Sequence, residues 1–91
     1  MASSLAEEIR LHLAEPFPDS VEKGSTYGEV DAVMIDADIV GLISDSSQPS
    51  PGQRSSLRAC ADQLSRSLQA LPPEARPYFE RLLRLARRAA T

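Results

Sequence analysis

The spacing of leucines in the second half of the chain constrains the fold more than any other feature. The apolar positions are Leu57, Ala61, Leu64, Leu68 and Leu71. Successive members are four, three, four and three residues apart, which is typical of a helix that packs one narrow stripe against another helix. Ser50-Pro51-Gly52-Gln53 predicts its beginning, with Ser50 as N-cap, Pro51 in the first turn and Gln53 completing a capping box. Pro72 and Pro73 then end the helix.

A further helix is predicted to run to about Ala90, beginning either at Pro73 or at Pro77. Its apolar side carries Tyr78, Phe79, Leu82, Leu83, Ala86 and Ala89, and its opposite side carries Arg81, Arg84, Arg87 and Arg88. Arginines in the last turns also interact favourably with the helix dipole. Residues 50–90 are therefore predicted to form a helical hairpin with a short proline turn.

The charge of the chain is divided between its two halves. Residues 1–53 hold ten acidic and two basic residues, a net charge of −8, whereas residues 54–91 hold eight arginines and three acidic residues, a net charge of +5. Halves of opposite charge attract each other, either within one molecule or between two copies.

A first helix is predicted close to the N-terminus. Ser4 and Glu7 have the spacing of a capping box, and Leu5, Ile9 and Leu13 repeat every four residues along one face. Pro16 ends this helix, because the residue before a proline is driven out of the helical conformation. Residues 16–28, which include Gly24 and Gly28, are expected to be a loop.

Residues 29–44 are nearly continuously apolar and β-branched, so their periodicity does not distinguish a helix from a strand. We favour one helix from Glu29 to Ser44, with Val30, Val33, Ala37 and Val40 as its packing seam and a place at the centre of the bundle. The alternative is a short strand over residues 30–35, followed by a helix capped by Asp36.

Length and composition then define the fold class. A chain of 91 residues with 42% hydrophobic and 25% charged residues is predicted to be one small mainly helical domain, a bundle of three to four helices spanning residues 1–91. Residues 44–49 are expected to be a polar linker.

The single Cys60 excludes an intramolecular disulfide and fits a reducing compartment. No segment resembles a secretory signal or a membrane span, so we expect a cytoplasmic protein that does not bind membranes.

The acidic segment 22–38 is the first candidate for a binding or catalytic site. Its candidate residues are Tyr27, Glu29, Asp31, Asp36 and Asp38, with Lys23 close by. A calcium loop beginning at Asp36 would need a carboxylate at its twelfth position, where the chain has Ser47. We therefore predict no metal and no cofactor, and we interpret the carboxylates mainly as helix caps and as partners of the C-terminal arginines.

The only histidine, His12, has Glu8 and Glu15 within reach on the same helix. We interpret it as a boundary residue that hydrogen-bonds to a neighbour. Cys60 lies at the edge of the leucine stripe and is interpreted as a small core residue. Nothing in the sequence brings the two together as a nucleophilic pair.

The arginines of the last helix form the second candidate site, with Arg81, Arg84 and Arg88 as its binding residues. Aromatic residues for base stacking do not alternate with them, and the whole chain is an anion with a net charge of −3. We therefore expect no nucleic-acid partner and treat binding of nucleic acid by this helix as a third hypothesis only.

The sequence favours a non-enzymatic protein-interaction module, a regulatory or accessory protein that acts as a homodimer. The apolar surface of the C-terminal hairpin exceeds what a short bundle covers, so we expect it to form the dimer interface. The residues predicted for this interface are Leu57, Leu64, Leu68, Leu82 and Leu83. The alternative is a small enzyme or a ligand-binding protein that uses the acidic segment 22–38.

Overall fold

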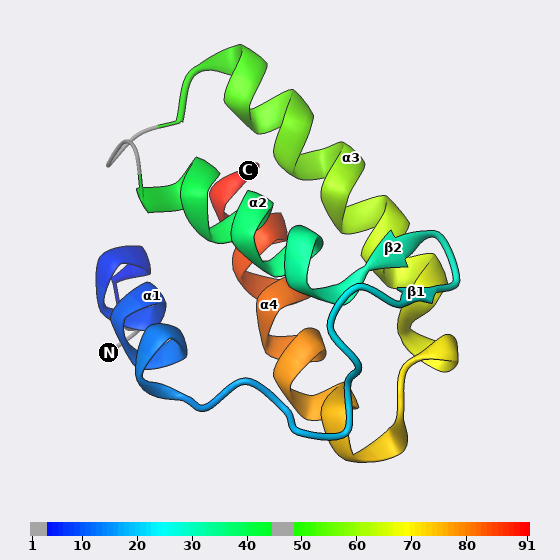
Figure 1. Cartoon of the computed structure of the whole chain (residues 1–91). Helices are drawn as coiled ribbons and strands as arrows, with labels where there is room; N and C mark the ends of the chain where they lie inside the picture. The colour runs from blue at the N-terminus through cyan, green and yellow to red at the C-terminus, as the bar shows by residue number, and fades with distance from the viewer. Residues whose placement is uncertain (1–3, 45–48) are drawn as a thin grey trace.

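The computed structural model describes residues 4–44 and 49–91, which form four α-helices and a two-stranded hairpin (Figure 1). The elements are α1 (Leu5–Ala14), β1 (Thr26–Tyr27), β2 (Val30–Asp31), α2 (Ala32–Ser44), α3 (Pro51–Ser67) and α4 (Arg76–Ala89). The 3₁₀ turns η1 (Leu68–Ala70) and η2 (Pro73–Ala75) connect α3 to α4. The predicted mainly helical fold with a C-terminal helical hairpin is confirmed.

The hairpin of α3 and α4 forms because its ends are defined by local chemistry. Ser50 and Gln53 make the predicted capping box at the start of α3, with Pro51 in the first turn. At the other end, the Arg76 guanidinium donates hydrogen bonds to the carbonyl oxygens of Leu68 and Gln69 (3.2 and 3.1 Å). Because these carbonyls follow the end of a helix, Arg76 supplies donors to acceptors that no further turn of helix pairs. The helix after the turn begins between the two predicted starts, since Pro73 opens η2 and α4 begins at Arg76.

The predicted helix over residues 29–44 is wrong in its first turn and in its packing face. Residues 30 and 31 belong to β2, and α2 begins at Ala32 because the Asp31 carboxylate accepts hydrogen bonds from the backbone N–H groups of Val33 and Met34 (3.0 and 3.2 Å). The alternative had the correct order of strand and helix, but it placed the cap five residues too late, at Asp36. The buried residues of α2 are Ala32, Ile35, Ile39 and Ile43. Of the predicted seam, only Val30 is buried, and it lies in β2 rather than in the helix.

The segment 16–28, predicted to be a loop, contains strand β1. Thr26 pairs with Asp31 and Tyr27 with Val30 in an antiparallel ladder, and Gly28 and Glu29 form the turn. Gly28 has φ +60°, the left-handed conformation that glycine adopts at the start of a two-residue hairpin turn. Buried Ser67 at the end of α3 holds this turn, because its Oγ accepts a hydrogen bond from the Glu29 N–H (2.9 Å) and donates one to the Gln63 carbonyl (2.8 Å).

Gly28→Ala is expected to lower the free energy of unfolding by about 2 kcal/mol, because a side chain is strained at this φ. The added methyl group would also lie 2.9 Å from the Ser67 hydroxyl oxygen. Urea unfolding followed by circular dichroism measures the change. Gly24→Ala is the matched control, since Gly24 has φ +86° but nothing within 4 Å of the added carbon. If both variants lose the same stability, backbone strain alone accounts for the effect and the contact with Ser67 does not contribute.

Helix α1 has the predicted cap and end but a different buried face. The Ser4 hydroxyl accepts a hydrogen bond from the Glu7 N–H (3.1 Å), and the helix ends at Ala14, ahead of Pro16. The buried side chains of α1 are Ile9 and His12, whereas Leu13, predicted to face inward, is 61% exposed. In Figure 1, α1 lies beside α2 and α4, away from the α3 side of the molecule. Of the predicted linker 44–49, residues 45–48 lie outside the described residues.

Candidate functional site

The candidate residues at the two ends of the hairpin turn each have a separate structural role. The Tyr27 hydroxyl accepts a hydrogen bond from the Glu22 N–H (2.9 Å). Glu29 forms a two-point ion pair with Arg66, with nitrogen–oxygen distances of 2.5 and 3.0 Å. The hydrogen bond from Arg66 is the main reason why the pKa of Glu29 lies below its usual value. With Asp31 capping α2, these three residues have three different partners.

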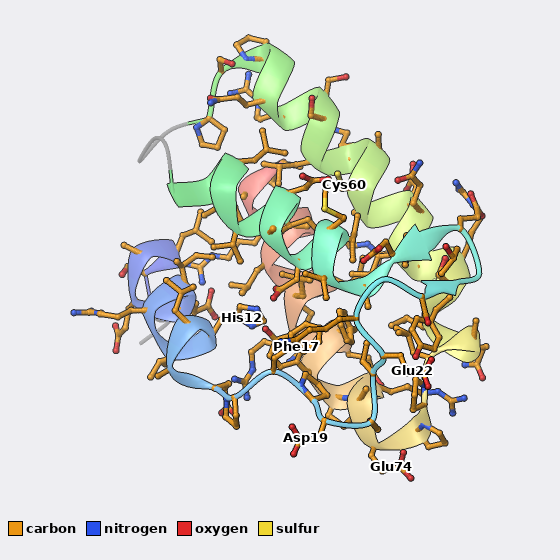
Figure 2. All side chains as sticks on the ribbon, in the orientation of Figure 1. His12, Phe17, Asp19, Glu22, Cys60 and Glu74 are labelled. Carbon is orange, nitrogen blue, oxygen red and sulfur yellow. The ribbon has the colours of Figure 1, made fainter. Side chains whose placement is uncertain are left out.

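Asp38 is exposed on α2, and its negative charge acts on the thiol of Cys60. Figure 2 shows Cys60 on α3. Burial is the main cause that raises the pKa of the Cys60 thiol, and the negative charge of Asp38 raises it further. The thiol is therefore protonated near neutral pH and is a weak nucleophile. Within residues 4–44 and 49–91, no three His, Cys, Asp or Glu side chains are placed to hold a metal ion.

Asp36, by contrast, joins three helices. His12 of α1 donates a hydrogen bond from Nε2 to Asp36 Oδ1 (2.9 Å), and the Tyr78 hydroxyl of α4 donates one to Asp36 Oδ2 (2.8 Å). The His12 side chain is 1% exposed and its ring lies 4.6 Å from the Tyr78 ring, centroid to centroid. We call His12, Asp36 and Tyr78 the polar cluster, and Figure 2 shows His12 pointing from α1 into the interior.

The chemistry of the polar cluster follows from these contacts. A carboxylate only accepts hydrogen bonds, so the hydrogen in the His12 contact must be on Nε2. The other ring nitrogen, Nδ1, is buried and has no partner among the described residues. Burial and the hydrogen bond to Asp36 raise the pKa of Tyr78, so that its phenol stays neutral. A nucleophilic triad would need a hydroxyl or thiol beside the free ring nitrogen, and the described residues place none there.

The interpretation of His12 as a boundary residue is wrong, whereas the predicted hydrogen bond to another residue is present. His12 is buried, and its partner is Asp36, 24 positions away, while Glu8 and Glu15 pair with arginines. One signal in the sequence pointed to this arrangement, because a histidine three residues after Ile9 lies on the same face of a helix. The identity of its partner depends on how α1 packs against α2 and was not visible in the sequence.

The arginines of α4 differ in their pairing. Arg81 forms an ion pair with Glu15 (3.2 Å), and Arg88 forms one with Glu8. Arg84, which lies between them on the helix, is exposed and makes no ion pair or hydrogen bond within the described part of the chain. These two pairs and the Glu29–Arg66 pair each join the acidic half of the chain to the basic half, so the opposite charges attract within one molecule.

Arg81, Arg84 and Arg88 line a groove of about 600 Å³ between α1 and α4. We call it the α1/α4 groove; its lining consists of Glu8, Leu11, Ala14, Glu15, Arg81, Arg84, Leu85 and Arg88. Leu85 is buried at its base, while Leu11 is 58% exposed. The groove thus combines an apolar base, an ion pair towards each end and the unpaired cation of Arg84.

The leucines predicted for a dimer interface lie in the interior of a single chain. Leu57, Leu64 and Leu82 are fully covered, Leu83 is buried and Leu68 is half-buried. The hydrophobic face of the hairpin is covered by α1, α2 and the segment before β1 of the same chain.

Comparison of the chain with protein-family models, with curated proteins and with solved structures found no match. None of the helices in residues 4–44 and 49–91 is both long and apolar enough to cross a membrane.

Proposed function

We propose that this chain is a non-enzymatic helical interaction module that associates with a second copy of itself through the α1/α4 groove. The observation that carries the proposal is the exposed Leu11 in a groove that is also lined by Ala14 and by the buried Leu85. Burying an exposed leucine against such side chains is favourable by roughly 1.5–3 kcal/mol when burial is complete. An exposed apolar side chain in a concave site with a charged rim is typical of a surface that binds protein.

A second copy fits this groove better than a nucleic acid does. Two of the three arginines in the lining are already paired with glutamates, which leaves both signs of charge along the rim. The carboxylates of Glu8 and Glu15 would repel a polyanion such as a nucleic acid. The α1 helix of a second copy instead presents a leucine and carboxylates on its outer face. A two-fold contact places the same surface of each copy against the other and is the commonest form of association between identical chains.

The apolar contact is tested by comparing Leu11→Lys with Leu13→Lys. Leu11 and Leu13 lie on the same helix and have nearly equal exposure, 58% and 61%, but only Leu11 lines the groove. We expect the unaltered chain to form dimers at micromolar concentration. Leu11→Lys should weaken dimerisation at least about tenfold, because it replaces a buried aliphatic contact by a cation beside Arg84. Leu13→Lys should leave the dimer unchanged.

Sedimentation velocity over a range of concentrations measures the association, and circular dichroism checks that both variants stay helical. A folded monomer at all concentrations would contradict the proposal that a second copy occupies the groove. Equal weakening by both substitutions would show that the copies meet on another face of α1.

A further inference from the structure

Arg84 is the cation of the α1/α4 groove that has no ion-pair partner among the described residues. Its neighbours on the same side of α4, Arg81 and Arg88, are each held by a glutamate of α1. Glu80, one turn before Arg84 on α4, forms no ion pair with it. Docking a second chain over Leu11 would take the guanidinium of Arg84 out of water, and a buried cation without an anion is strongly unfavourable. The occupant of the groove therefore has to supply a carboxylate.

The α1 helix of a second copy offers one free carboxylate in a suitable place. Glu8 and Glu15 are already paired within their own chain, whereas the side chain of Glu7 is exposed and has no partner among the described residues. Glu7 lies one turn before Leu11, and residues four apart lie on the same face of a helix. A helix that inserts Leu11 into the opposite groove thus brings Glu7 to the same surface.

We infer that Arg84 is the residue that recognises the second copy and that Glu7 of that copy is its partner. This inference rests on the proposed function. In a two-fold contact each ion pair occurs twice, because Arg84 of either chain meets Glu7 of the other. Such pairs select the partner by charge, since like charges placed opposite each other oppose association.

The test uses two charge reversals, Arg84→Glu and Glu7→Arg, first separately and then mixed. Each variant alone places like charges against each other twice, so we expect its dimerisation to weaken at least about tenfold. In an equimolar mixture, the glutamate introduced at position 84 of one chain faces the arginine introduced at position 7 of the other. At the second contact the unaltered Glu7 and Arg84 face each other, so the mixture should form a heterodimer about as strong as the original dimer. Sedimentation velocity, with one chain carrying a fluorescent label, measures all three samples.

Asp19→Arg is the control, because it makes the same change of charge sign on an exposed loop residue outside the groove. Alone, it should dimerise like the unaltered chain. A labelled Arg84→Glu chain should bind it more weakly than it binds Glu7→Arg, because the glutamate introduced at position 84 still faces an unaltered Glu7 at one of the two contacts. Thermal unfolding shows whether Glu7→Arg, which places a cation near the N-terminus of α1, leaves the helix folded. If Glu7→Arg unfolds α1, Glu7→Gln replaces it and should weaken the dimer. Its mixture with Arg84→Glu keeps one unaltered contact between Glu7 and Arg84, so the mixture should associate more tightly than either variant alone but less tightly than the original dimer.

The outcomes separate this inference from the proposed function. A dimer that withstands Arg84→Glu, or a mixture that fails to associate, overturns the pairing of Arg84 with Glu7 while the groove remains the docking surface. An unaltered chain that stays monomeric overturns both.

Discussion

Replacing Asp36 with alanine is expected to lower the free energy of unfolding by about 3 kcal/mol. The carboxylate of Asp36 accepts hydrogen bonds from His12 and from Tyr78 and so connects α2 to α1 and α4. Without it, the Nε2–H group of His12 would lose its acceptor in a site that is only 1% exposed, too buried for solvent to replace the lost bond. Losing the same acceptor costs the Tyr78 hydroxyl less free energy, because this side chain is half-buried and can turn towards solvent.

Urea unfolding of Asp36→Ala measures this loss, and Asp38→Ala is the matched control. Asp38 lies two residues further along the same helix and is exposed, so its replacement should change stability by no more than about 0.5 kcal/mol. Tyr78→Phe removes only one of the two hydrogen bonds and should cost about 1 kcal/mol. If Asp36→Ala unfolds with the same free energy as the unaltered chain, the polar cluster does not hold α1 in place.

Phe79→Ala is expected to lower the free energy of unfolding by about 3–5 kcal/mol. Phe79 has no exposed surface and is the largest by volume of the fully buried side chains. Its ring contacts Tyr78 and Phe17 edge to face, at centroid distances of 5.1 and 6.0 Å. Removing it would open a cavity between α4 and the segment that leads from α1 to β1, and it would remove the aromatic contacts as well.

The loss is measured by thermal and urea unfolding, with Glu80→Ala as the control on the same helix. Glu80 is exposed, so its replacement removes no buried surface and should leave stability within about 0.5 kcal/mol. In a chain of this size the loss in Phe79→Ala is a large part of the total stability, which is roughly 5–10 kcal/mol. A small effect would mean that Phe17 and its loop move inward to fill the space.

The C-terminal hairpin could be predicted from the sequence because local chemistry determines it. The capping box of Ser50 and Gln53, the leucine stripe of α3 and the prolines after it act over a few residues and do not depend on the rest of the chain. The beginning and end of α1 were predicted for the same reason, since Ser4 and Pro16 act on the helix termini directly.

Tertiary structure decided that a hairpin turn precedes α2 and which face of α1 is buried. A continuous apolar run such as residues 29–44 fits a helix or a strand equally, and the turn at Gly28 is stabilised by Ser67, which is distant in the sequence. Likewise, Leu13 suits the inner face of α1 by hydrophobicity, yet His12 occupies that face because Asp36 of α2 supplies an acceptor there.

The ion pairs of the candidate site were likewise predictable from the sequence only in part. The sequence by itself predicted attraction between the acidic half and the basic half, either within one molecule or between two copies, because charge requires no particular geometry to attract. The ion pairs in the structure lie within one molecule. Which arginine remains unpaired depends on the register between α1 and α4, because the distance from Glu8 to Glu15 matches that from Arg88 to Arg81 and leaves Arg84 between them. That register is set by the burial of Ile9 and His12, which is a property of the packed helices and not of either helix alone.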